Sequence, residues 1–169
     1  EGRKFTTLDE VERTLSAEDL MICNAEEPMC IGGVFGGLES GVTEDTTNIF
    51  IESAYFNPVS IRKTARRHGL NTDASFRFER GIDPHNTIYV LKYAAMLIKE
   101  LTGGSIASEI TDIYPTPLNN FEVDITLNKI HTLIGKEIET EQIERIFDGL
   151  EMKIVERTAE GYKLEVPAY

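Results

Sequence analysis

The 169-residue chain has no tryptophan and only two cysteines, Cys23 and Cys30. Since these cysteines form no CxxC pair and have no histidine nearby, we expect two small core residues in a reducing compartment; a disulfide or a metal site is the less favoured alternative. The chain also lacks a run of about 18 apolar residues and a charged-then-apolar leader. These absences argue against a membrane span and a signal peptide.

A methionine start is also missing, because the chain begins Glu1-Gly2. Such a start is expected of an excised piece or a processed product. With 41% hydrophobic and 27% charged residues, the composition is that of an ordinary soluble globular protein. A chain of this length can bury one good core, or one moderate core and a small satellite.

Basic residues are few. Seventeen Lys and Arg against 29 Asp and Glu give a net charge of −12, which disfavours a nucleic acid as partner of the chain as a whole. Residues 57 to 84 differ, with six basic and three acidic side chains, a local balance of +3. This basic island is suited to attract a phosphate backbone. The favoured alternative is a solvated helix face that pairs with nearby acids.

The stretch from Ile31 to Pro84 organises the chain. It opens with four glycines in six positions, Gly32-Gly33-Val34-Phe35-Gly36-Gly37. Glycine permits positive φ angles and close approach of the backbone to a ligand. We therefore expect this loop to line a pocket wall rather than to pack in a core.

Asn48 to Phe56 alternates like a strand and carries one carboxylate, Glu52. On a strand Glu52 would share a face with Phe50, Ala54 and Phe56, so it would need hydrogen-bond donors or have a raised pKa. The alternatives are an edge-strand glutamate in water or one paired with an arginine of the basic island. From the pattern alone, a functional and a structural role of Glu52 are about equally favoured.

Several short strands and two capped helices are predicted around this stretch. Residues 4 to 30 contain short apolar runs with turns between them, which indicates a mostly antiparallel sheet. Asn57 and Gly69 bound one helix. Asp83-Pro84 and Gly103-Gly104 bound a second. Its buried stripe is predicted to consist of Ile88, Leu91, Ala95, Ile98 and Leu101.

A boundary is predicted at residues 114 to 120, where two prolines and two asparagines interrupt any regular pattern. The domains are therefore 1–115 and 116–169. The second reads as β-α-α-β-β, with Asn128 and Thr140 as helix caps, and resembles a small winged-helix-like module. The predicted fold class is α+β: a mostly antiparallel sheet with packed helices, followed by this module.

Three blocks in fixed order carry a family resemblance: GGVFGGLESGV, IESAYF and ARRHGLNTDASFRFERGIDP. They resemble the central blocks of the β subunit of bacterial phenylalanine-tRNA ligase. Residues 1–115 are similar to the later part of its B3/B4 editing domain, and residues 116–169 resemble a truncated B5 domain. The resemblance implies a domain that hydrolyses tRNA(Phe) mischarged with tyrosine, remote from the site of synthesis.

The resemblance also implies the site residues. The editing pocket would consist of Gly36, Glu52, Thr72 and Ala74, and the candidate tRNA contacts are Arg62, Arg66 and Arg67. Glu52 would select tyrosine by accepting its phenol proton, Gly36 and Ala74 would leave room for the ring, and Thr72 would orient it. No catalytic residue and no metal ligand is assigned. A histidine that the family supplies to this pocket has no counterpart at His68, His85 or His131, so the piece alone is expected to be inactive or weakly active.

For the whole enzyme the resemblance implies a cytoplasmic α2β2 heterotetramer with the α subunit, which binds tRNA(Phe) and is not attached to a membrane. ATP and magnesium are expected to bind outside this piece, which itself holds no cofactor. The alternative is a non-catalytic tRNA-binding or structural module of a multidomain synthetase subunit.

Overall fold

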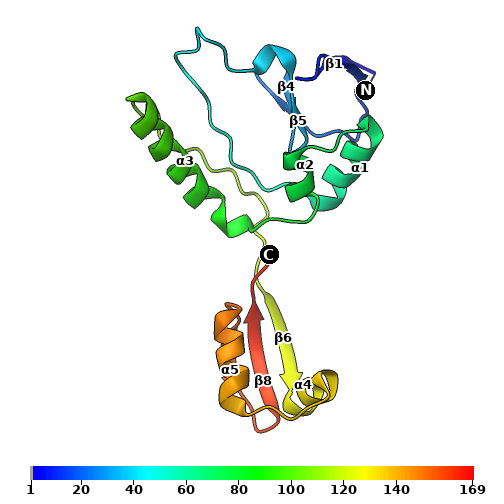
Figure 1. Ribbon diagram of the computed structural model, residues 1–169, viewed down its shortest axis with the longest axis vertical. Coiled ribbons are helices and arrows are strands. Elements are labelled where there is room, and N and C mark those ends of the chain that lie inside the picture. Colours follow the sequence, from blue (N-terminus) through cyan, green and yellow to red (C-terminus); the bar gives the residue numbers. More distant parts are fainter. Residues whose placement is uncertain (1) are drawn as a thin grey trace. The chain divides into compact units, whose positions relative to one another are not determined.

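The computed structural model describes residues 2–169 and divides into two compact units, one ending at Thr111 and one beginning at Asp112. The first unit runs from blue to green in Figure 1, and the second runs from yellow to red. Helices and antiparallel sheets make up both units, so the predicted α+β class is confirmed. No helix within residues 2–169 combines the length and apolar character needed to cross a membrane.

Short antiparallel strands open the first unit, as the sequence predicts. β1 (Lys4–Thr6) pairs with β2 (Glu12–Thr14). A second sheet has the order β3-β4-β5, from β3 (Met21–Cys23), β4 (Pro28–Ile31) and β5 (Phe35–Gly36), and leads into the 3-10 turn η1 (Leu38–Ser40). The β4–β5 connection is the glycine-rich turn, so this turn is fixed by strands on both sides.

The helices of the first unit are α1 (Pro58–His68), α2 (Asp73–Phe78), the 3-10 turn η2 (Pro84–Asn86) and α3 (Thr87–Thr102). The predicted ends of α1 are confirmed: the Asn57 side chain accepts hydrogen bonds from two backbone amides, and Gly69 has a left-handed φ of 63°. Asp83 caps η2 rather than α3 directly, so the regular helix begins at Thr87. Gly103 ends it as predicted, with a φ of 72°.

The core of the first unit lies between α1 and the strands. Its buried members are Phe5, Leu15, Ile31, Val34, Phe56, Ile61 and Ala65. Phe78 of α2 packs against this cluster, and its ring meets that of Phe56 edge to face with centroids 5.0 Å apart. The core therefore joins the glycine turn, α1 and α2 into one packed body.

The strand predicted at Asn48 to Phe56 is wrong. This segment has no regular secondary structure, and Phe50 at its beginning is 94% exposed whereas Phe56 at its end is 9% exposed. A strand requires a neighbouring strand to satisfy its backbone groups, and neither sheet of the unit extends to this segment. The shared face predicted for Phe50, Glu52, Ala54 and Phe56 is therefore not formed either, since one phenylalanine is exposed and the other is buried.

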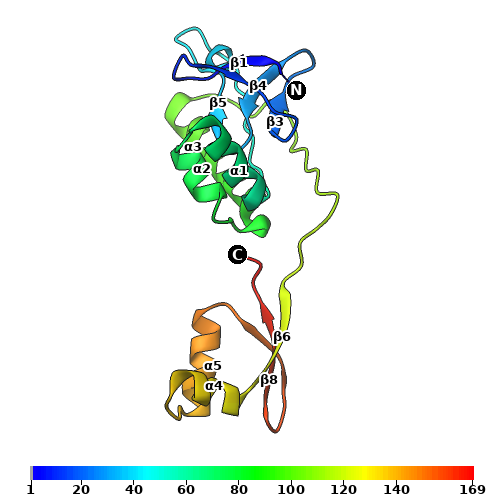
Figure 2. The same ribbon diagram turned by 90° about the vertical axis from the view of Figure 1, so that its right-hand side faces the viewer.

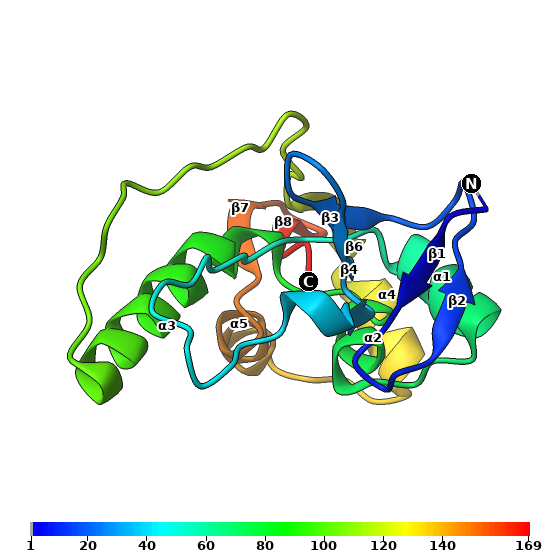
Figure 3. The ribbon, with the colours of Figure 1, turned by 90° about the horizontal axis from the view of Figure 1, so that it is seen from above.

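The buried stripe predicted for α3 is also wrong. No residue of α3 is buried; Ile88, Leu91, Ala95 and Ile98 are half-buried, and Leu101 is 75% exposed. Figures 1 and 3 show α3 standing apart from α1 and the strands of the first unit. The helix has the predicted amphipathic pattern, but the described part of the unit supplies no element to cover its apolar face.

The second unit has the predicted order β6 (Phe121–Thr126), α4 (Leu127–Ile134), α5 (Thr140–Gly149), β7 (Lys153–Arg157) and β8 (Gly161–Val166). Its sheet is antiparallel with the order β6-β8-β7, and both helices lie on one side of the strands (Figure 2). Its core consists of Ile130, Ile143, Phe147, Tyr162 and Leu164. Two caps differ from prediction, because Thr126 rather than Asn128 precedes α4 and Glu139 rather than Thr140 precedes α5.

Candidate functional site

The glycine turn between β4 and β5 is tightly bonded. The Val34 amide donates to the Ile31 carbonyl at 2.9 Å, and the Gly37 amide donates to the Met29 carbonyl at 2.9 Å. Gly33 has a φ of +67°, a left-handed conformation that disfavours any side chain. The turn is therefore a rigid part of the sheet.

Three of its glycines serve close packing, which corrects the expectation of a pocket wall. A Cβ on Gly33 would lie 2.7 Å from the Phe56 ring and 2.9 Å from Ile61 Cδ1. A Cβ on Gly32 would lie 3.3 Å from the Phe56 ring. On Gly37 it would lie 2.6 Å from the Met29 carbonyl oxygen. Protein atoms thus already occupy the space beside these three positions.

Gly36, the predicted site residue, is less confined. A Cβ there would meet only Leu8, with Cδ1 at 3.0 Å, and Leu8 is 48% exposed. Gly36 lies directly opposite Cys30 in the β4–β5 ladder. Opposite residues of an antiparallel pair point to the same face, so Cys30 and Gly36 mark one surface of the turn.

Glu52 is the one ionisable residue among the four predicted pocket residues. Burial raises the pKa of the Glu52 carboxyl group, although the residue as a whole is exposed. Burial also raises the pKa of the Cys30 thiol, and the negative charge of Glu52 raises it further. Within residues 2–169 no hydrogen bond or ion pair to this carboxylate is found, so it is not paired with an arginine of the basic island. The carboxylate is close to protein atoms yet open to an approaching donor.

Thr72 fixes α2 to the glycine turn. Its hydroxyl donates to the Val34 carbonyl at 2.6 Å and accepts from the Ser75 amide at 3.0 Å, and the Ser75 hydroxyl completes a capping box. Because a hydroxyl has one proton, that of Thr72 is already committed to Val34. Thr72 thus holds half-buried Ala74, in the first turn of α2, in a fixed position relative to the turn.

The three candidate tRNA contacts differ in their partners. Arg67 forms ion pairs with Glu18 and Asp19. The Arg62 guanidinium donates to the Glu79 carbonyl at 2.9 Å. Arg66 is exposed and forms no ion pair with any residue from 2 to 169. The predicted pairing with nearby acids is therefore confirmed for Arg67, whereas the charge of Arg66 is not neutralised by any residue from 2 to 169.

The acid that binds Arg67 belongs to a buried network that the sequence did not reveal. The Asp19 side chain is fully buried and lies 2.7 Å from His68 Nε2. Burial raises the pKa of Asp19, but the Ser16 amide, His68 and Arg67 together outweigh burial and leave it below its ordinary value. A partner 48 residues away along the chain leaves no local pattern by which to predict it.

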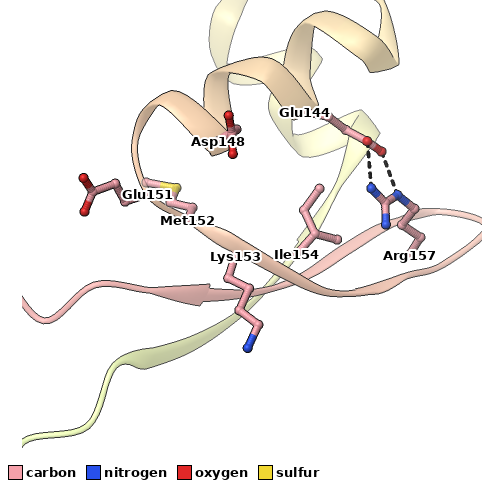
Figure 4. Close-up of a pocket in the computed structure, with 7 residues that line it drawn as sticks. All are labelled: Glu144, Asp148, Glu151, Met152, Lys153, Ile154 and Arg157. Carbon is pink, nitrogen blue, oxygen red and sulfur yellow. Dashed lines mark hydrogen bonds and ion pairs between the residues drawn. The ribbon is translucent and has the colours of Figure 1, made fainter.

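Two clefts of about 420 Å³ each lie away from these residues. One lies between α5 and β7 and is lined by Glu144, Asp148, Glu151, Met152, Lys153, Ile154 and Arg157; Figure 4 shows the Glu144–Arg157 ion pair at one end. The other lies on α3 beside Tyr93, Met96 and Leu97. Neither contains a predicted site residue, and nowhere in residues 2–169 do three or more His, Cys, Asp or Glu side chains gather as metal ligands would.

Sequence comparisons now identify the family. Residues 1–103 match the model of the B3/4 domain. The whole chain is 63% identical over 169 residues to the phenylalanine–tRNA ligase beta subunit of Bacteroides fragilis, 52% identical over 170 residues to that of Porphyromonas gingivalis, and 44% identical over 172 residues to that of Syntrophus aciditrophicus. It spans 21% of the length of each of these relatives. The resemblance inferred from the three sequence blocks is confirmed, and the chain belongs to the B3/4 domain family.

Proposed function

We propose that this chain is part of a phenylalanine–tRNA ligase β subunit whose B3/4 region hydrolyses tyrosyl-tRNA(Phe). One observation carries the proposal: Gly36 and Thr72, from separate segments, both lie at the glycine turn, and the charge of Glu52 acts on Cys30 opposite Gly36. Gly36 lies opposite Cys30, Glu52 acts electrostatically on Cys30, and Thr72 is bonded to Val34 in the same turn. All of them fall within the region that matches the B3/4 model.

The proposed selection depends on an unpaired acceptor. Tyrosine differs from phenylalanine only by its phenol hydroxyl, which can donate a hydrogen bond to the Glu52 carboxylate. Burial disfavours the charged form of this carboxylate and no donor within residues 2–169 satisfies it, so a bound phenol would replace the hydrogen bonds of the water it displaces. A phenylalanyl ring would displace the same water and leave the acceptor unpaired, and such a difference separates two substrates by a factor on the order of 10⁴.

The chemical step is hydrolysis of an ester. A water molecule attacks the carbonyl carbon, the bond between that carbon and the ribose oxygen breaks, and tyrosine and free tRNA are released. We assign no catalytic group in this chain to that step. Glu52 selects the substrate, and Thr72 acts by fixing α2 to the turn rather than by contacting the ring with its hydroxyl, because its proton is bound to Val34.

The properties of the whole enzyme are part of the same proposal, since the chain spans 21% of its relatives. They comprise an α2β2 assembly with an α subunit, tRNA(Phe) as partner, cytoplasmic location, and ATP and magnesium bound in other parts of the enzyme. For tRNA contact Arg66 is the leading candidate, because its charge pairs with no residue from 2 to 169, followed by Arg62. Arg67 ranks last because Glu18 and Asp19 neutralise it.

The test uses the full-length enzyme that carries this sequence, assembled with its α subunit. Glu52→Ala should reduce deacylation of tyrosyl-tRNA(Phe) at least tenfold while leaving synthesis of phenylalanyl-tRNA unchanged. Glu39→Ala, which removes an exposed glutamate from the neighbouring turn η1, should change neither reaction. Unchanged deacylation by Glu52→Ala would contradict the selector role.

A non-catalytic tRNA-binding role is the second candidate, favoured by the exposed charge of Arg66, which pairs with no residue from 2 to 169. Under this role Arg66→Ala should weaken tRNA binding and reduce the salt dependence of binding by about one counterion. Arg67→Ala serves as the matched comparison, with a smaller effect because its charge is already neutralised. Loss of binding by Arg66→Ala with deacylation intact in Glu52→Ala would favour this candidate over editing.

A further inference from the structure

The segment that carries Glu52 has few attachments to the rest of the first unit. Residues 47–55 lie in neither a helix nor a strand, and no backbone hydrogen bond joins them to another element of the part of the chain that the structure describes. Phe50 extends almost entirely into solvent. A carboxylate on such a segment needs specific contacts to keep one position.

Two contacts hold the segment close to Glu52. Both lie after it in the chain. Ala54 packs against the core, in which Phe56 is buried against Phe78 and the glycine turn. The residue directly after Glu52 is tethered, because the Ser53 hydroxyl donates to the Thr87 carbonyl at 2.8 Å. Thr87 is the first residue of α3, and a carbonyl oxygen has two lone pairs, so it can accept from Ser53 in addition to a bond within the helix.

We propose that Ser53 is a positioning residue for Glu52, which holds the selecting carboxylate in place by tying its segment to the beginning of α3. The inference rests on the proposed editing function. Consecutive Cα atoms are about 3.8 Å apart, so a tether at position 53 restrains the backbone of residue 52 directly. Ala54 and Phe56 pack against the core two and four residues after Glu52, but neither forms a directional bond beside it. Removal of the Ser53 hydroxyl would thus leave the packing of Ala54 as the nearest restraint on Glu52.

The experiment uses the full-length enzyme with its α subunit and measures deacylation of tyrosyl-tRNA(Phe). Ser53→Ala should lower kcat/KM about tenfold, the order expected for loss of one hydrogen bond that positions a reacting complex. Ser53→Thr keeps the hydroxyl and should restore most of the rate. Ser105→Ala removes an exposed hydroxyl that no partner within residues 2–169 engages, and should leave the rate unchanged.

A double mutant separates positioning from a general effect on the fold. If Ser53 acts through Glu52, Ser53→Ala should add nothing to the loss already caused by Glu52→Ala. Synthesis of phenylalanyl-tRNA, measured on the same preparations, should stay unchanged in all variants and so reports an intact assembly. Undiminished deacylation by Ser53→Ala, or losses that multiply in the double mutant, would overturn the inference.

Failure of this inference differs from failure of the proposed function. If Glu52→Ala reduces deacylation and Ser53→Ala does not, Glu52 keeps its selecting role and only the tether is rejected. If Glu52→Ala has no effect, the selecting role itself is rejected, and the inference falls with it. If Ser53→Ala lowers the yield of assembled enzyme, Ser53→Thr still decides, since a rate as low as that of Glu52→Ala in this hydroxyl-retaining variant would overturn the tether.

Discussion

Two regions of the first unit contribute to the candidate site in different ways. The turn-and-helix region, from β4 to η1 and from α1 to α2, is held by a packed core, a capping box and capped helix ends. The connecting segment, residues 41–56, has no regular structure and is anchored near its end. Gly36, Thr72 and Ala74 lie in the first region and Glu52 lies in the second. The scaffold of the site is thus rigid, while its one ionisable group depends on a few contacts.

Two phenylalanines of the connecting segment give the sharpest test of this contrast. Phe56→Ala should lower the free energy of unfolding of the first unit by about 3 kcal/mol or more, because it empties space within the core against Phe78 and Gly33. Phe50→Ala removes the same atoms from a 94% exposed position and should change the free energy of unfolding by less than about 0.5 kcal/mol. Urea titration of both variants checks the difference, and equal effects would show that the segment is anchored along its whole length.

Two glycines test the rigidity of the turn. Gly33→Ala would put a side chain at a left-handed φ of +67°, with contacts of 2.7 Å to Phe56 and 2.9 Å to Ile61. We therefore expect the free energy of unfolding to fall by about 2–3 kcal/mol. Gly36→Ala meets only the flexible end of Leu8 at 3.0 Å and should lose less than about 1 kcal/mol. The same urea titrations measure both. A Gly33→Ala variant as stable as Gly36→Ala would mean that the turn adjusts freely.

The hydrogen bonds of Thr72 between the turn and α2 should contribute less to the free energy of unfolding than Phe56 or Gly33. Thr72→Val keeps the shape of the side chain but removes the bond to the Val34 carbonyl and the cap on the Ser75 amide. We expect the free energy of unfolding to fall by about 1–2 kcal/mol. Thr111→Val, at an exposed position of the same unit, controls for the replacement itself. A loss no larger than that of the control would remove Thr72 as the tie between α2 and the turn.

The elements that local chemistry determines were predictable from the sequence. The ends of α1 follow from an Asn-Pro start and a glycine stop, and the β-α-α-β-β order of the second unit follows from periodicity and turn residues. The failures concern contacts between distant residues. Alternation from residue 48 to 56 does not show whether a neighbouring strand is present to pair with the segment. The apolar stripe of α3 likewise does not show whether another element covers it.

The candidate site divides in the same way. The sequence blocks indicated Gly36, Glu52, Thr72 and Ala74, but the role of the Thr72 hydroxyl appeared only when Val34 was found 2.6 Å away. The Asp19–Arg67–His68 network joins residues 48 and 49 positions apart, and the Ser53 tether spans 34. Such partners depend on the fold as a whole, so no pattern within a single element predicts them.

Two carboxyl groups extend the contrast to pH. Asp19, bound to α1, has a lowered pKa, so its contribution to stability is present above its ordinary value of 3.8 and is lost as the pH falls through the folded value. Glu52 has a pKa raised by burial, so the sign is opposite. Its contribution is fully present below the ordinary value of 4.5 and is lost as the pH rises through the folded value.

Glu52→Gln should therefore have the smallest effect of the changes considered, and it should be stabilising. Glutamine cannot ionise, so the variant avoids the charged form that burial disfavours and should have a slightly higher urea midpoint than the parent at pH 8. At pH 4 the parent carboxyl is largely protonated when folded, and the difference should shrink. Glu39→Gln, an exposed glutamate of η1, controls for the removal of one negative charge. A Glu52→Gln variant that is less stable than the parent at pH 8 would show that the carboxylate is satisfied by a donor, and the unpaired acceptor needed to select tyrosine would not exist.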